Sequence, residues 1–203
     1  MRPIAMLLLA ALLLPLTPSA LGKGEAQRRW EMMNQIRKDK FDLVLPEVMR
    51  DKDVEMWITV IREGMDDPLV DDLGRGYTGG WGYYVFTYTP EQQASGRVER
   101  MVLGIGTHLI EENGAYDLVT EGAFDLAELV AERDPRTIAL NYAEHIGAAD
   151  GLSHTAFLHL SELLGPTYAE RFVSAQKLIS DFRSRRVATE VAAFARAGEI
   201  SRE

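Results

Sequence analysis

The chain has 203 residues, which predicts one domain with room for a small appendage. Hydrophobic residues make up 46% of it and charged residues 26%, the balance of a globular protein with a substantial core. The formal net charge of -9 weighs against unaided binding to nucleic acid or to an anionic membrane, because both need basic patches. The absence of cysteine excludes a disulfide framework, a thiolate nucleophile and a cysteine-ligated zinc site.

The N-terminal segment predicts export. Arg2 precedes an uninterrupted apolar run over residues 4–14, and the small residues Ala20 and Gly22 flank Leu21 in a small-x-small cleavage pattern. The apolar run is too short to span a bilayer comfortably. We expect residues 1–22 to be a signal peptide, and the mature protein, starting at Lys23, to be periplasmic or secreted and free of the membrane. A mature chain without cysteine suits an oxidising compartment, because nothing in it can mispair.

The first half of the mature chain predicts helices around a buried strand. Residues 25–38 carry apolar side chains at helical spacing, which indicates an amphipathic surface helix, and a second helix is expected from about Asp42. Residues 56–61 form a short β-branched and aromatic run between charged flanks, so we expect a strand buried on both faces. After it, Asp67 and Pro68 open a short helical turn that Gly74 ends.

The glycine-rich segment 74–84 leaves two interpretations open. Its four aromatic residues present a stacking surface for a sugar or peptide, or they fold back onto the core, which we favour. The segment lacks the lysine and Ser/Thr of a phosphate-binding loop.

The rest of the chain predicts an antiparallel hairpin followed by alternating strands and helices. Residues 83–89 and 98–106 are expected to pair through a turn at 90–96. Ser153 or Asp150 caps the helix that Gly165 then closes. The remaining expected elements are strands at 116–120, 137–142 and 171–174, and helices at 125–133, 152–164, 176–186 and 189–200.

Two polar segments are candidates for chemistry, because both follow predicted strand ends, where ligands bind in open α/β sheets. In residues 62–68, the acidic side chains Glu63, Asp66 and Asp67 are an alternative cation site, but a helical turn is favoured. The densest metal-competent group lies in residues 144–159. Its members are Glu144, His145, Asp150, His154 and His159.

The spacing of that second group disfavours a metal site. His154 and His159 lie about 140° apart around a helix, whereas histidines that chelate together are three or four residues apart. Convergence of Glu144, His145, Asp150 and His154 across the loop remains the alternative. A serine triad built on Ser153 or Ser161 lacks the G-x-S-x-G signature. We therefore assign no catalytic residue and no metal ligand.

Taken together, the segments resemble the N-terminal domain of the creatinase, prolidase and aminopeptidase P ("pita-bread") metallopeptidase family. The resemblance runs in order from about Arg28 to Glu203, and the terminal stretch Thr189-Glu190-Val191 resembles the linker helix that leads into the family's catalytic domain. It rests on Ile36-Arg37, residues 41–46, Met49-Arg50, residues 55–58, Arg62-Glu63, Asp67-Pro68, residues 138–142, Glu144-His145, residues 149–154, Leu164-Gly165-Pro166, Tyr168, residues 173–175 and Arg185.

The resemblance implies a mixed β-sheet flanked by helices over residues 23–186, and the start of a linker helix over 187–203. Family peptidases cleave the bond before proline with two divalent metal ions held in the C-terminal domain. No residue here matches a family metal ligand, so we expect no cofactor and no activity in this chain alone, and a truncated or split chain.

The family's N-terminal domain makes dimer contacts and roofs the active site. The resemblance therefore implies self-association or a catalytic metallopeptidase domain as partner, and a peptide as the parent enzyme's substrate. The residues expected to touch that substrate are Arg62, Glu63, Asp67, Glu144, His145, Asp150 and His154. The alternatives are a free-standing periplasmic binding or regulatory module and a small metal-binding protein that uses residues 144–154.

Overall fold

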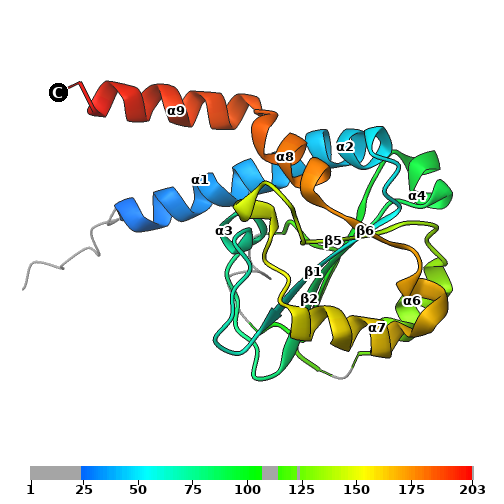
Figure 1. The fold of residues 1–203 in the computed structure, drawn as a ribbon. Coiled ribbons are helices and arrows are strands. Elements are labelled where there is room, and N and C mark those ends of the chain that lie inside the picture. Colours follow the sequence, from blue (N-terminus) through cyan, green and yellow to red (C-terminus); the bar gives the residue numbers. More distant parts are fainter. Residues whose placement is uncertain (1–23, 107–113, 123, 203) are drawn as a thin grey trace, which may run out of the picture.

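The computed structural model describes residues 24–106, 114–122 and 124–202. Within these residues a mixed sheet of six strands, in the order β4-β3-β2-β1-β5-β6, lies between two layers of helices (Figure 1). The predicted α/β class with a mixed, helix-flanked sheet is confirmed. The predicted signal peptide, residues 1–22, lies outside the described residues and stays a prediction.

The strands are β1 (Met56–Arg62), β2 (Trp81–Thr87), β3 (Glu99–Leu103), β4 (Leu118–Thr120), β5 (Ile138–Leu140) and β6 (Phe172–Ser174). β2 pairs antiparallel with both β1 and β3, whereas β1–β5, β5–β6 and β3–β4 are parallel pairs. The helices are α1 (Glu25–Asp39), η1 (Lys40–Val44), α2 (Leu45–Asp51), α3 (Val70–Leu73), α4 (Pro90–Ser95), α6 (Leu126–Arg133), η2 (Gly147–Ala149), α7 (His154–Ala169), α8 (Gln176–Ser184) and α9 (Ala188–Ile200).

The central strand β1 is buried on both faces, as its apolar run predicts. Trp57 and Ile61 face a core shared with α1, α2 and α8, and Ile58 and Val60 face a core shared with α6 and α7. Figure 1 shows the same division, with α6 and α7 on one side of the sheet and α1, α2 and α8 on the other. Each fully buried large side chain contributes about 1.5–3 kcal/mol, so the two cores make β1 the organising strand of the fold.

The first two predicted helices are joined rather than separated. The π-helix η1 connects α1 to α2 without a break, and Pro46, in the first turn of α2, has no N–H with which to continue the helical bonds. The buried guanidinium of Arg100 on β3 donates to the carbonyl of Phe41 and to the carboxylate of Asp42. Arg100 therefore fixes the π-helical segment against the sheet, a tertiary contact that no local pattern indicates.

Three local expectations need adjustment. The turn expected at 90–96 is the helix α4, which Pro90 begins and Gly96 ends at φ 68°. β2 begins at Trp81, so three of the four aromatics of residues 74–84 (Trp81, Tyr83 and Tyr84) are strand residues. Ser153, not Asp150, caps α7 by accepting from the backbone N–H of Ala156, and Gly165 interrupts the helix at φ 75°.

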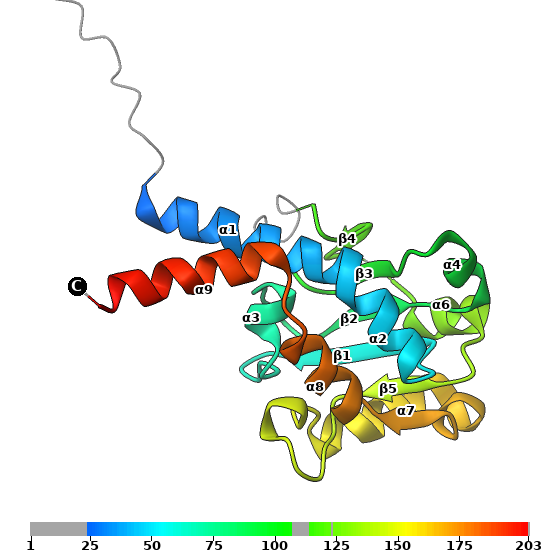
Figure 2. The ribbon, with the colours of Figure 1, turned by 90° about the horizontal axis from the view of Figure 1, so that it is seen from above.

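Helices α1 and α9 form a pair that we call the terminal-helix arm. They run side by side in opposite directions and extend beyond the sheet in both views (Figures 1 and 2). Glu190 is the only buried residue of α9. In the part of the chain that the structure describes, no helix combines the length and the apolar character that crossing a bilayer requires.

Candidate functional site

The two loops predicted to carry function meet at one edge of the sheet. Asp67 follows β1 and Asn141 follows β5, and these strands are parallel neighbours, so their carboxyl ends lie together. The Asn141 amide donates to Asp67 Oδ2 at 2.9 Å, and the backbone N–H of Leu69 donates to Asp67 Oδ1 at 2.9 Å. This junction joins residues 62–68 to the segment that begins at Asn141.

The same asparagine extends the junction into the core. Trp57 donates its indole N–H to Asn141 Oδ1 at 2.7 Å, and Asn141 also donates to the Thr59 hydroxyl at 3.1 Å. Burial raises the pKa of Asp67, although its two hydrogen-bond donors oppose that rise. The structure thus makes Asp67, which is 2% exposed, an internal anchor of the loop rather than a surface contact.

The backbone at Gly151 packs closely against Asp67 and Pro68 and so completes the junction. A Cβ at this position would lie 2.1 Å from Asp67 Oδ2 and 2.6 Å from Pro68 Cδ. Real side chains do not tolerate such distances, so glycine is required for the second loop to pack on the first.

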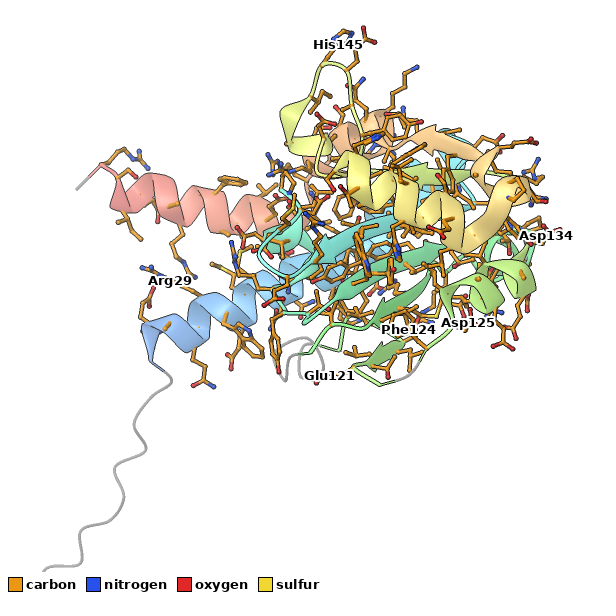
Figure 3. All side chains as sticks on the ribbon, turned by 60° about the horizontal axis from the view of Figure 1, so that its bottom comes forward. Arg29, Glu121, Phe124, Asp125, Asp134 and His145 are labelled. Atoms are coloured by element: carbon orange, nitrogen blue, oxygen red, sulfur yellow. The ribbon has the colours of Figure 1, made fainter. Side chains whose placement is uncertain are left out.

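The other predicted contact residues of these loops lie at the surface. Glu63, Glu144, His145, Asp150 and His154 are exposed, and Figure 3 shows His145 at the outer tip of its loop. Glu144 Oε2 lies 3.6 Å from His145 Nε2, and Asp150 Oδ1 accepts a hydrogen bond from the backbone N–H of Ala143 at 3.1 Å. Among the residues that the structure describes, no three His, Asp or Glu side chains gather as a metal site.

Arg62, the last predicted contact residue, belongs to a cluster that we call the stacked patch: Arg62, Trp81 and His159. The guanidinium of Arg62 lies 5.8 Å from the Trp81 ring centroid, and the Trp81 and His159 rings stack at 4.0 Å and 4°. His159 Nε2 is hydrogen-bonded to the Tyr83 hydroxyl at 2.7 Å. Burial lowers the pKa of His159 and raises the pKa of Tyr83 to about 12.

Sequence reasoning singled out His159 only as a possible metal ligand and did not bring it together with Trp81, because the two residues are far apart in the chain. The only local signal for Trp81 was its place among the aromatics of residues 74–84. Of these, Tyr83 and Tyr84 are buried, which confirms the interpretation that they fold back onto the core. Tyr77 is 70% exposed, so only part of the segment follows that interpretation.

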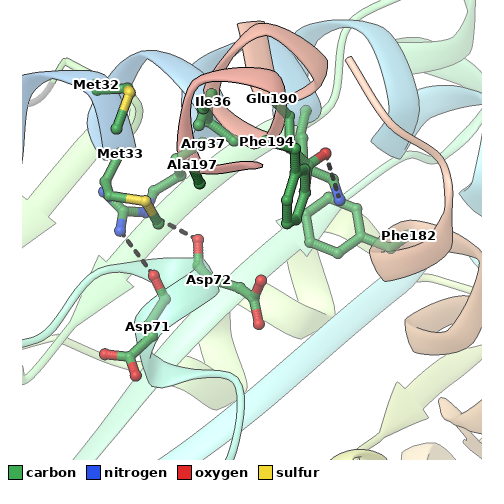
Figure 4. Close-up of a pocket in the computed structure, with 12 residues that line it drawn as sticks. Met32, Met33, Ile36, Arg37, Asp71, Asp72, Phe182, Glu190, Phe194 and Ala197 are labelled. Carbon is green, nitrogen blue, oxygen red and sulfur yellow. Dashed lines mark hydrogen bonds and ion pairs between the residues drawn. The ribbon is translucent and has the colours of Figure 1, made fainter. Parts of the chain in front are cut away.

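A groove of about 310 Å³ lies between α1 and α9, with Met33, Ile36 and Phe194 among its walls (Figure 4). At its inner end the Lys40 ammonium lies 3.7 Å from Glu190 Oε2, and it donates to the Arg183 carbonyl at 3.4 Å. Glu190 Oε2 has no hydrogen-bond partner. Burial lowers the pKa of Lys40, and the nearby Glu190 carboxylate opposes that change.

Comparison with known proteins gives no relative from which to transfer a function. No protein-family model matches the chain, and neither a curated protein nor a solved structure does so. The function is therefore argued from the residues of the site and from their arrangement.

Proposed function

We propose that this chain is the non-catalytic N-terminal domain of an exported Xaa-Pro peptidase-like metallopeptidase, and that it serves dimerisation and substrate gating. The junction of residues 62–68 with residues 141–154 carries the proposal. These are the two loops that the family resemblance implicates in roofing an active site, and they converge on one sheet edge through Asp67, Asn141 and Gly151.

The junction gives the loops a fixed base and charged outer parts. Glu63, Glu144 and Asp150 are exposed around this edge, which favours the amino terminus of a peptide, and Arg62 offers a partner for a carboxylate. The domain would bind and orient a peptide in this way. The hydrolytic step itself would belong to the metal-containing domain of the peptidase.

The kinetic test uses the peptidase that carries this domain. Replacing His145 and His154 with alanine should change the ratio of kcat/KM between short and long peptides, because both side chains are exposed on the roofing loop. Leu158→Ala, an exposed change on α7, is the matched control and should leave the ratio unchanged. Identical ratios in all three variants would refute the gating role.

The intact mass of the protein in the exported fraction of its source tests whether this chain is part of a longer peptidase. The proposal expects roughly two to three times the 22.7 kDa of this chain, since a second domain must be present. A mass that matches residues 23–203 alone would contradict it.

That second outcome would favour a free-standing binding module, for which the groove between α1 and α9 is the specific observation. Its walls combine apolar side chains with a few charged ones, and its inner end holds a buried carboxylate oxygen without a donor. A volume of about 310 Å³ lies at the lower end of the range typical of small-ligand sites.

A further inference from the structure

The groove between α1 and α9 has room for a small molecule with an apolar body. Its apolar lining includes Met32, Met33, Ile36, Phe182, Phe194 and Ala197, which come from α1, α8 and α9 (Figure 4). The volume of about 310 Å³ accommodates on the order of ten non-hydrogen atoms, at roughly 30 Å³ for each water-sized volume. Removing a hydrocarbon chain of that length from water supplies a favourable free energy of binding.

The inner end of the groove is polar, and the protein does not fully satisfy it. Glu190 is 9% exposed, and its Oε1 accepts a hydrogen bond from Arg186. Among the described residues, no group donates to Glu190 Oε2, which lies 3.7 Å from the ammonium of Lys40. Lys40 is 4% exposed and donates to the carbonyl of Arg183 at 3.4 Å. A buried acceptor without a donor is unfavourable, so a ligand group that donates to it is bound favourably.

The two charges at this end select against a charged head group. An ammonium would meet the like charge of Lys40, and a carboxylate would meet the like charge of Glu190. A hydroxyl or a primary amide carries both a donor and an acceptor without a charge. Such a group can donate to Glu190 Oε2 and accept from Lys40 Nζ at once, because only 3.7 Å separates these two atoms.

Side chains at the surface of the groove can rotate to admit the head group. Glu190 Oε2 is itself buried, so a neighbouring side chain must move before a ligand reaches it. Phe194 and Met33 line the groove and are 58% and 44% exposed, and exposed side chains change rotamer within nanoseconds. The guanidinium of Arg186 lies 5.0 Å from the Phe194 ring centroid, a contact that is weak at an exposed site.

We propose that this groove binds a medium-chain molecule with a neutral hydroxyl or amide head group. A hydrocarbon of about eight to ten carbons lies against Met33, Ile36 and Phe194, and the head group lies between Lys40 and Glu190. The assignment deepens the binding-module function, the second candidate above, and rests on it. It depends on neither the gating role nor the dimerisation role.

Nuclear magnetic resonance of the isotope-labelled chain tests the groove with four probes that share one eight-carbon chain: octanol, octanamide, octanoate and octylammonium. Octanol and octanamide should shift the amide resonances of α1 and α9 with a Kd on the order of 0.1 mM, a value in the range for ligands of about ten atoms. Octanoate and octylammonium should bind at least about tenfold more weakly, because each brings a like charge against Glu190 or Lys40.

One pair of variants tests the place of binding. Ala197→Leu adds three carbon atoms inside the groove and should weaken octanol binding at least about tenfold, because the hydrocarbon loses its space. Ala195→Leu is the matched control, since Ala195 is an exposed residue of the same helix and lies outside the groove lining. Its octanol Kd should stay within about twofold of the parent value.

A third variant tests the role of the head group. Glu190→Gln removes the negative charge beside Lys40, so octanoate should bind about tenfold more tightly, while the octanol Kd should change less than about threefold. The Ala197 and Ala195 variants keep Glu190, so they test the site even where Glu190→Gln loosens α9.

Three results would overturn the assignment. They are groove resonances that octanol does not shift up to its solubility limit, charged probes that bind as tightly as octanol, and equal weakening by Ala197→Leu and Ala195→Leu. The binding-module function fails on a different measurement, an intact mass far above that of this chain. A longer protein whose groove still prefers octanol to octanoate would keep the ligand site and lose the free-standing module.

Discussion

The sheet and the terminal-helix arm bury opposite kinds of side chain. In β1 every residue from Met56 to Ile61 is buried, and the two faces of the strand enter two separate cores. In α9 the single buried residue is a glutamate, whereas the large apolar residues are exposed. The sheet is therefore completed by its own chain. The arm leaves the large apolar residues of α9 exposed.

The buried Asn141 at the sheet edge and the buried Glu190 under the arm differ in how fully they are hydrogen-bonded. At the sheet edge, Asn141 has partners in Trp57, Thr59 and Asp67, all within 3.1 Å. Under α9, Glu190 Oε1 accepts from Arg186, whereas Glu190 Oε2 has no hydrogen-bond donor and lies 3.7 Å from the Lys40 ammonium. A satisfied network specifies one arrangement, whereas an unsatisfied one leaves the helix above it free to shift.

The largest expected effect comes from the sheet. Trp57→Ala should lower the free energy of unfolding by about 3–5 kcal/mol, because a fully buried ring is lost and Asn141 Oδ1 loses its donor. Urea unfolding measures it. Phe194→Ala in the arm is the comparison and should cost under about 1 kcal/mol, because surface changes usually cost little. Equal losses of unfolding free energy in the two variants would show that the arm is packed as tightly as the sheet.

The junction of the loops should be the next most sensitive place. Gly151→Ala should cost about 1–3 kcal/mol, because the added methyl group overlaps the Asp67 carboxylate and Pro68 and the loop must move. Gly147→Ala is the matched control in the same loop, because a methyl group added there meets open space within 4 Å and no cost is expected. Thermal melting compares the two, and indistinguishable curves would mean that the close approach is not maintained in solution.

A smaller and local effect is expected under the arm. Lys40→Met removes the cation that lies 3.7 Å from Glu190 Oε2, while Arg186 stays paired with the other carboxylate oxygen. Because α9 has few inward contacts, undocking of that helix limits the cost to the whole domain. Amide hydrogen exchange of residues 191–200 should accelerate about tenfold or more, while exchange in β1 stays unchanged. Lys38→Met, an exposed change on α1, is the control. Faster exchange in β1 would show that sheet and arm are energetically coupled.

The smallest expected effect is a pH dependence from the stacked patch. Burial holds the pKa of His159 below its ordinary value, so the unfolded chain binds this proton more tightly than the folded one. Neutral His159 therefore makes its full contribution to the free energy of unfolding above about pH 6.5, the pKa of histidine in the unfolded chain. That contribution is lost as the pH falls toward the lower pKa of the folded state. His159→Phe keeps a ring against Trp81 and removes the titration, so its stability should fall less between pH 7 and pH 5. Parallel stability profiles of the two proteins would contradict this.

The elements predicted best are those specified by neighbouring residues. The β-branched run of β1 and the glycine that ends α3 act within a few residues, so the sequence indicates them directly, and it narrowed the cap of α7 to Ser153 or Asp150. The helix α4 replaces an expected turn, because six residues between two strands carry too little periodicity to indicate a helix. The π-helical segment has no local signal, because the carbonyl of Phe41 is satisfied by Arg100 from a distant strand.

The candidate site was predicted in outline only. The positions of both loops followed from predicted strand ends, but the role of Asp67 did not, since its burial depends on Asn141, 74 residues away. The stack of Trp81 on His159 depends likewise on α7 lying against the sheet.

Local sequence was sufficient to specify the α/β class, the buried central strand, a helix cap at Ser153 or Asp150, the end of a helical turn at Gly74, and the acidic charge of the chain. These features depend on periodicity, capping and charge, which act over a few residues or follow directly from composition. Tertiary packing was needed to make Asp67 an anchor while Glu144 and His145 lie in solvent, and to leave the large apolar side chains of α9 exposed. The burial of a side chain depends on which distant segments pack around it, and no local pattern records that.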